Sequence, residues 1–196
     1  MLKLIVEEIK DILESELSFA DLVCGLSQNV KKTITDENGK AIQKNFPVYY
    51  DAKENDGSYI DLTLDDSYKS MLYFKEIATL VKEDRQSYII VNSTVRLICW
   101  WNYKAVNKDT TNSLMSAYIL SKLPASLPDM DFLNGIQIKV LNMPKNDSAI
   151  FSEYSYNEAE TQFLLYPYDF FSVELGINYR FSKPCVPDIE LNPSIC

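Results

Sequence analysis

The chain has 196 residues, of which 46% are apolar and 24% are charged, values typical of a globular domain and too apolar for an intrinsically disordered chain. Acidic side chains outnumber basic ones by 28 to 19, and the net charge of -9 disfavours a broad nucleic-acid-binding surface. The sequence contains no histidine, which excludes catalytic triads with an imidazole base and metal sites with histidine ligands.

Residues 2–17 carry apolar side chains at spacings of three and four, with acidic side chains on the opposite face. This period predicts an amphipathic helix that packs on one side. The same acidic residues interrupt the apolar run, so the segment lacks the core of a signal peptide, and no other run reaches the length that spans a bilayer. We therefore expect a soluble protein that is made in a cytoplasm.

Residues 28–50 are typical of a β-hairpin, because two strand-like runs flank Asn38-Gly39, a pair that supplies the positive φ of a tight turn. Pro47 lacks a backbone donor, so the returning strand is expected to lie at an edge or to end nearby. The lysines of this segment are Lys31, Lys32, Lys40 and Lys44. Such a group is more typical of an exposed, aggregation-resistant strand face than of a nucleic-acid site.

The middle of the chain predicts a short strand over 59–64 and, over 68–80, a short helix or an irregular loop. The clearest strand pattern begins at 88 and runs to about 106, with apolar residues in one phase and polar residues in the other. Its length exceeds that of a usual strand, so it is expected to be a central, bent element of the sheet.

Trp100 and Trp101 are neighbours on this strand, so their side chains must point to opposite faces of the sheet. Trp101 lies on the same face of the strand as Cys99, a residue type that is usually buried, and is assigned to the core. Trp100 shares its face with Arg96 and has two interpretations: it packs beneath a helix, or it anchors a contact between subunits.

The C-terminal part predicts a second amphipathic helix over 114–123, a strand over 134–140, and a last strand over 171–181 in which every odd residue is apolar. Together the elements predict an α+β fold, with a mostly antiparallel sheet of about four to six strands, an N-terminal helix, and one or two helices packed on one face. Residues 1–182 form one domain in this interpretation. Residues 183–196 form a proline-rich arm, whose prolines are Pro184, Pro187 and Pro193.

Motifs that carry chemistry are missing from the sequence, and we expect no catalytic residue, no cofactor and no metal. The cysteines at 24, 99, 185 and 196 form no CxxC pair, and the five glycines form no phosphate-binding loop. The thiols are expected to be reduced, and Cys185 and Cys196 would pair only if the arm folds back. An enzyme with two catalytic carboxylates stays open in principle, because such sites leave no motif.

Aromatic residues are plentiful, with 13 Tyr, 9 Phe and 2 Trp, and they serve cores, protein interfaces and sugar platforms alike. A carbohydrate- or peptide-binding module that presents these residues is therefore the alternative function. The tyrosines near a proposed sheet rim are Tyr154, Tyr156, Tyr166 and Tyr168. They are interpreted as a mixture of packing and interface residues.

The order of the elements resembles that of the tail terminator and neck-ring (head–tail connector) proteins of tailed bacteriophages. The segments that carry the resemblance are 2–17, 30–46, 89–103, 114–123 and 171–181. The resemblance implies a structural virion protein without catalytic residues, assembled in the bacterial cytoplasm into a sixfold or twelvefold ring at the neck or tail. Its partners would be copies of itself and other neck or tail proteins, with no membrane and no specific nucleic-acid binding, although DNA would pass through the ring.

Ring assembly gives candidate interface residues, because neighbouring subunits often lend a strand or an arm to each other's sheet edge. We expect these residues on the long strand, at the hairpin turn and in the arm. They are Trp100, Arg96, Asn38, Gly39, Lys40, Pro184 and Pro187.

Overall fold

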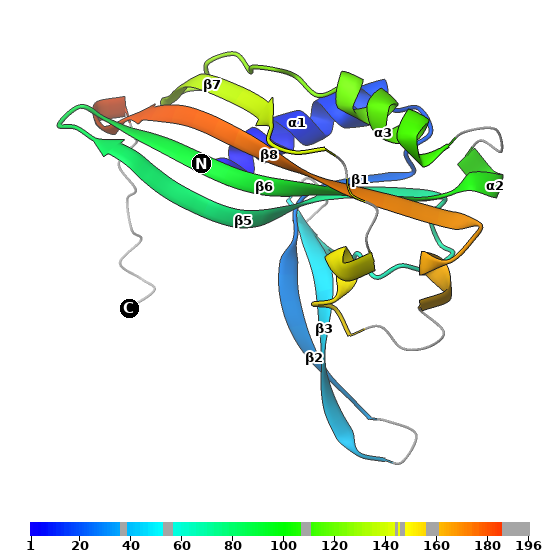
Figure 1. Ribbon diagram of the computed structural model, residues 1–196. Coiled ribbons are helices and arrows are strands. Elements are labelled where there is room, and N and C mark those ends of the chain that lie inside the picture. Colours follow the sequence, from blue (N-terminus) through cyan, green and yellow to red (C-terminus); the bar gives the residue numbers. More distant parts are fainter. Residues whose placement is uncertain are drawn as a thin grey trace.

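The structure, a computed structural model, describes residues 1–35, 39–52, 57–106, 111–143, 145, 148–155 and 161–185. It is an α+β fold with an N-terminal helix, a five-stranded mixed sheet and a three-stranded antiparallel sheet (Figure 1), which confirms the expected fold class. The elements in chain order are α1 Leu2–Glu16, β1 Leu22–Leu26, β2 Gln28–Thr35, β3 Ala41–Asp51, β4 Ser58–Asp61, β5 Ser70–Asp84, β6 Tyr88–Asn102, α2 Tyr103–Val106, α3 Asn112–Ser121, β7 Leu133–Val140, η1 Ser148–Phe151, η2 Gln162–Leu164, β8 Tyr168–Ser182 and η3 Lys183–Cys185. No helix among these described residues is long and apolar enough to cross a bilayer.

The large sheet has the strand order β1-β5-β6-β8-β7 and is antiparallel except for the short β1, which runs parallel to β5. Strands β6 and β8 pair without interruption, from Tyr88 opposite Ser182 to Asn102 opposite Tyr168. Both strands alternate apolar and polar residues. Their register places the apolar residues of β6 opposite those of β8, so both sets face the same helices. Their pairing forms the centre of the sheet.

Helices α1 and α3 cover one face of the large sheet (Figure 1). The apolar stripe of α1, with Ile5, Ile9 and Leu13 fully buried, packs in one cluster with the odd-numbered residues of β6 and β8. Since α1 has no side-chain cap at its N-terminus, this packing supplies most of its stability. Helix α3 is capped by Thr111, whose hydroxyl accepts a hydrogen bond from the Leu114 N–H at 3.3 Å.

A second apolar cluster lies on the opposite face of the large sheet. It contains Trp100 and Ile98 of β6, Tyr73 of β5 and Phe151 of η1, each at most 2% exposed. Because β5 and β6 pass between the two clusters, their inner halves are buried on both faces. This second cluster also contains Tyr49 at the base of the small sheet, which is thereby attached to the large one.

The small sheet has the order β2-β3-β4, and its β2–β3 hairpin projects away from the large sheet (Figure 1). The expected hairpin is confirmed, with a regular register from Gln28 opposite Val48 to Thr35 opposite Ala41. The strand with Pro47 was expected to lie at an edge or to end nearby: β3 is the central strand of the small sheet, and it ends four residues later at Asp51. The proline fits there because β4 pairs with β3 only from Val48 onward.

Two further expectations differ from the structure, and one strand was not predicted. The predicted helix or loop over 68–80 is wrong, because residues 70–84 form β5. The first half of β5 is buried on both faces, and its continuous apolar run therefore lacks the alternation that marks a half-buried strand. The strand that was expected to reach about 106 ends at Asn102, whose side chain accepts from the Lys104 N–H and opens α2. Strand β1, a buried run of five residues, was not predicted.

Candidate functional site

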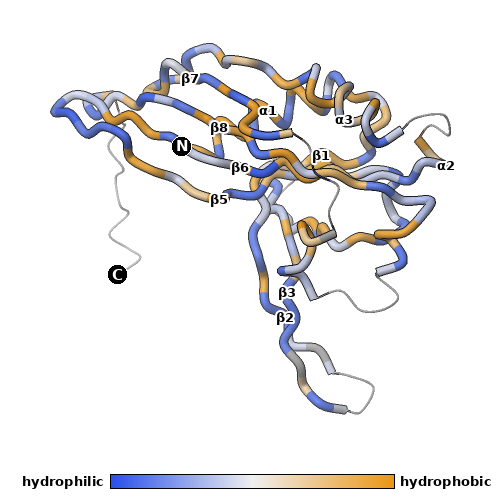
Figure 2. The backbone as a smooth tube through the Cα atoms, viewed as in Figure 1, coloured by the Kyte–Doolittle hydropathy of each residue, from blue (hydrophilic) through white to orange (hydrophobic). Residues whose placement is uncertain are grey.

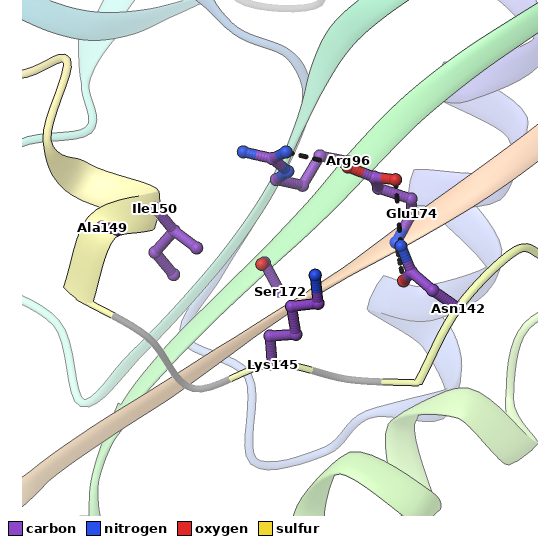
Figure 3. A pocket seen from close by; sticks show the side chains of 7 residues that line it. All are labelled: Arg96, Asn142, Lys145, Ala149, Ile150, Ser172 and Glu174. Atoms are coloured by element: carbon purple, nitrogen blue, oxygen red, sulfur yellow. Dashed lines mark hydrogen bonds and ion pairs between the residues drawn. The ribbon is translucent and has the colours of Figure 1, made fainter.

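A small pocket of about 180 Å³ opens on the sheet face opposite the helices (Figure 3). It brings together residues from four parts of the chain: β6, β8, the segment after β7, and η1. The lining residues are Arg96, Asn142, Lys145, Ala149, Ile150, Ser172 and Glu174. Of the predicted interface residues, Arg96 lines this pocket.

Arg96 and Glu174 stand opposite each other on β6 and β8, and the Arg96 guanidinium donates to Glu174 Oε1 at 2.8 Å. Asn142 holds the second carboxylate oxygen, with Nδ2 at 2.9 Å from Glu174 Oε2, and accepts from the Glu174 N–H at 3.2 Å. Both side chains of the ion pair are about a third exposed. The pair is therefore already satisfied within the chain and closes one wall of the pocket.

Lys145 adds a second positive charge to the pocket and is fixed to β8 by its backbone. Its N–H donates to the Ser172 carbonyl at 2.9 Å, and its carbonyl accepts from the Ser172 N–H at 2.7 Å. The Lys145 side chain and the Ser172 hydroxyl point into the same space (Figure 3). With Arg96 and Lys145 against the single carboxylate of Glu174, the lining carries an excess of one positive charge.

The volume of this pocket lies below the range of most small-molecule sites. Ligand sites have volumes of about 300 Å³ or more, and this pocket is smaller. The residues that line it include no cysteine and no histidine. A carboxylate carried by a partner would meet the Lys145 ammonium and the Ser172 hydroxyl. Among the described residues, no group of three or more His, Cys, Asp or Glu side chains is placed to hold a metal.

Trp100 is fully buried and presents no surface to a partner. Its indole N–H donates to the Phe163 carbonyl at 2.7 Å, and its ring stacks on Tyr168 with centroids 5.1 Å apart. The environment of Trp100 therefore supports the packing interpretation, with η2 lying over it, and gives no sugar platform at this position. Trp101 is buried on the opposite face, as the strand pattern predicted.

The tyrosines of the rim divide between packing and exposure. Tyr154 is buried, and burial raises its pKa above the usual tyrosine range. Tyr168 is half-buried against Trp100, whereas Tyr166 is 79% exposed. Tyr156 lies outside the described residues.

The predicted interface residues of the hairpin and the arm are described in part. Gly39 has φ 78 and is exposed, in agreement with a turn that requires a left-handed residue. Lys40 and Pro184 are exposed as well. Asn38 and Pro187 lie outside the described residues.

The start of the arm is attached to the turn between β5 and β6. The Lys183 N–H donates to the Ser87 carbonyl at 3.0 Å, and its ammonium pairs with Asp84. Of the cysteines, Cys24 and Cys99 are buried free thiols and Cys185 is an exposed one, while Cys196 lies outside the described residues. The structure thus agrees with reduced thiols at the three described positions.

A buried polar contact fixes the hairpin to the rest of the molecule, and nothing in the sequence indicated it. The Tyr49 hydroxyl of β3 donates to Glu7 Oε2 of α1 at 2.8 Å, although helix and hairpin lie far apart in the sequence. Gly25 of β1 leaves room for this contact, because a Cβ there would lie 2.3 Å from Glu7 Oε1 and 2.9 Å from the Tyr49 ring. Helix, strand and hairpin therefore meet at one point.

Charge is unevenly distributed over the two sides of the large sheet. The outer face of α1 is acidic, and its exposed acidic residues are Glu8, Glu14 and Glu16. The hairpin on the other side is polar (Figure 2), and its sequence over 28–51 carries four lysines against three acidic residues. Acidic residues thus gather on α1, whereas lysines slightly outnumber acidic residues on the hairpin.

Comparisons of the chain with protein-family models, with curated proteins and with solved structures found no match.

Proposed function

We propose that this protein is a structural subunit of a tailed-bacteriophage virion and that it assembles into a ring at the neck or tail, as tail terminator and head–tail connector proteins do. The observation that carries the proposal is the projecting, locally basic hairpin on an otherwise acidic chain (Figure 1). The order of the elements, which resembles that family, adds support. The protein acts in this proposal through its surfaces and performs no reaction.

The hairpin is built to make a contact outside its own chain. Beyond its base, the side chains of Lys31, Thr33, Thr35 and Lys40 are exposed. An isolated two-stranded ribbon has little stability of its own in water, so a partner surface would stabilise the projecting part. Lys32 pairs with Asp61 of β4 within the chain at 2.8 Å, and the excess of lysines over acidic residues on the hairpin favours a partner of negative charge.

The negative surface that fits this hairpin is present on the same protein. Helix α1, whose exposed acidic residues are Glu8, Glu14 and Glu16, covers one face of the large sheet, and the hairpin projects on the other side (Figure 1). When two complementary surfaces are different patches of one chain, copies join head to tail, and such a series closes into a ring when the rotation per subunit divides the circle. The arrangement therefore supports a ring rather than an isolated two-fold pair for this contact.

Charge reversal on the hairpin tests the ring. We expect the wild-type chain to sediment as a species of about six or twelve copies and to form rings in negative-stain images. The double variant Lys31→Glu, Lys40→Glu should lose the ring, because both substituted positions are exposed and meet the acidic helix of the neighbour.

The control for this experiment is Lys139→Glu on β7, which makes one exposed charge change away from the hairpin and should leave rings intact. Rings that persist in the hairpin variant, or a wild-type chain that forms no ring at high concentration with or without tail proteins, would refute the proposal. Gene neighbours tell the two functions apart: portal, capsid and tail genes support the virion component, whereas polysaccharide-processing genes support the carbohydrate-binding alternative.

A further inference from the structure

The outer edge of β5 is open along most of its length. Strand β1 pairs with β5 only at residues 71–74, and the chain turns into β2 after the Ser27 N–H donates to the Phe74 carbonyl at 2.7 Å. In the part of the chain that the structure describes, no other strand pairs with this edge. Residues 75–84 therefore leave about 30 Å of strand edge without a partner, along the lower margin of the sheet in Figure 1.

The middle of this open edge is apolar. Ile77, Leu80 and Val81 are 42%, 57% and 63% exposed, and Figure 2 shows the apolar stretch on β5. Residues 78–81 pair regularly with β6, and the register shifts only on either side of them. An apolar strand edge without a partner is a template for pairing with another strand, and this edge is regular over residues 78–81.

The sequence of the open edge is complementary to itself. If a second copy runs antiparallel with Thr79 opposite Thr79, apolar residues meet apolar residues in the middle and opposite charges meet on both flanks. The opposed residues are Ile77 and Val81, Ala78 and Leu80, Glu76 and Lys82, and Lys75 and Glu83. Lys75 and Glu83 already pair within the chain, with Glu153 and Arg85, so the Glu76–Lys82 contact is the one that a second copy would complete.

We propose that two copies of this protein join through the open edges of β5, antiparallel about a two-fold axis at Thr79, so that their large sheets become one continuous sheet. The backbone donors and acceptors of residues 75–84 find partners, and the exposed apolar side chains are covered. Because each Glu76 meets a Lys82 of the other copy, the contact carries two symmetric charge pairs. This surface differs from the hairpin and from α1, so the two-fold pair and the ring are independent: in a ring, β5 would join two rings to each other.

Complementary charge reversals test the pairing directly. Glu76→Lys places two lysines opposite each other at both ends of the contact, and Lys82→Glu does the same with two glutamates. Each single variant should therefore weaken the two-fold pair by about tenfold or more in sedimentation equilibrium. The double variant Glu76→Lys, Lys82→Glu restores opposite charges and should restore pairing.

Mixing the two single variants gives the decisive result. A Glu76→Lys chain and a Lys82→Glu chain are complementary at both ends, so we expect the mixture to form heterodimers while each variant alone is largely monomeric. Both positions are exposed, so the substitutions should leave the stability of the fold unchanged. Pairing that is indifferent to these charges, or a mixture no better paired than its components, would overturn the proposal.

Hydrogen exchange distinguishes a second copy from other occupants of the edge. We expect the amides of residues 75–84 to gain protection as the full-length chain is concentrated and to lose it in the single variants. Protection at low concentration, where the chain is monomeric, would overturn the two-fold pair. Loss of rings in the hairpin variant with pairing retained would support both proposals, because they place the two contacts on separate surfaces.

Discussion

Single residues decide how the hairpin is held against the body. Tyr49 is 2% exposed and bonds to Glu7, whose second carboxylate oxygen is buried with no partner among the described residues. The carboxylate therefore depends on the tyrosine for its hydrogen bond inside the protein. A buried charge-assisted hydrogen bond of this kind stabilises the contact and also fixes the orientation of the two side chains.

Tyr49→Phe should lower the free energy of unfolding by about 1–3 kcal/mol, because it leaves the Glu7 carboxylate buried without this donor. Urea unfolding measures the change, and the control is Tyr59→Phe, which keeps a ring that is 63% exposed and should be neutral. Equal stability of both variants would show that the contact contributes nothing.

The same pair predicts a pH dependence. Burial raises the pKa of Tyr49, and the Glu7 hydrogen bond and charge raise it further. A raised pKa means that the folded state holds the proton more tightly, so this contribution is complete below the ordinary tyrosine pKa of 10.0 and is lost as the pH rises above it. Tyr49→Phe should therefore flatten the fall in stability above that pH.

Thiol reactivity reports on the surroundings of three cysteines. Burial raises the pKa of the Cys24 thiol to about 12 and that of Cys99 well above its usual range, whereas Cys185 is exposed. In iodoacetamide labelling of the native protein at pH 8, Cys185 should react more than about tenfold faster than either buried thiol. Peptide mass mapping assigns the sites, and rapid labelling of Cys24 without unfolding would contradict the buried position.

At the scale of elements, the sequence pattern of α1 predicts which of its residues are buried, whereas that of β5 does not. The apolar residues of α1 recur at helical spacing, so the position of a residue along the helix indicates whether its side chain is buried. Strand β5 has two environments along one strand: its first half is covered on both faces, and its second half is open at the edge. No single period describes such a strand.

Leu13→Ala tests the stripe of α1. Leu13 is fully buried between α1 and the sheet, and its truncation should cost about 2–5 kcal/mol of unfolding free energy through the lost contacts and the cavity that remains. Leu4→Ala removes the same atoms from a side chain that is 49% exposed on that helix. Urea unfolding should show little change for Leu4→Ala, and comparable losses in the two variants would mean that the helix packs through a different face.

At the scale of the whole molecule, the two proposed contacts use separate surfaces and have different symmetry. The hairpin and the acidic face of α1 are different patches, which favours a head-to-tail series, whereas the β5 edge is complementary to itself, which favours a two-fold pair. Variants at Lys31 and Lys40 should therefore remove rings and leave pairs, and variants at Glu76 and Lys82 should remove pairs and leave rings.

The α1 helix, the hairpin and the alternation of β6 and β8 followed from the sequence alone, because their periods, their turn residues and the phase of Trp100 and Trp101 are local properties of the chain. Tertiary structure decided the rest. The identity of β5 as a strand depended on burial from two sides, the pocket joined Arg96 to residues far along the chain, and the partners of Glu7 and Trp100 came from distant elements. A local pattern records which face of an element is apolar, but it holds no information about which distant surface covers that face or which strand edge is left open.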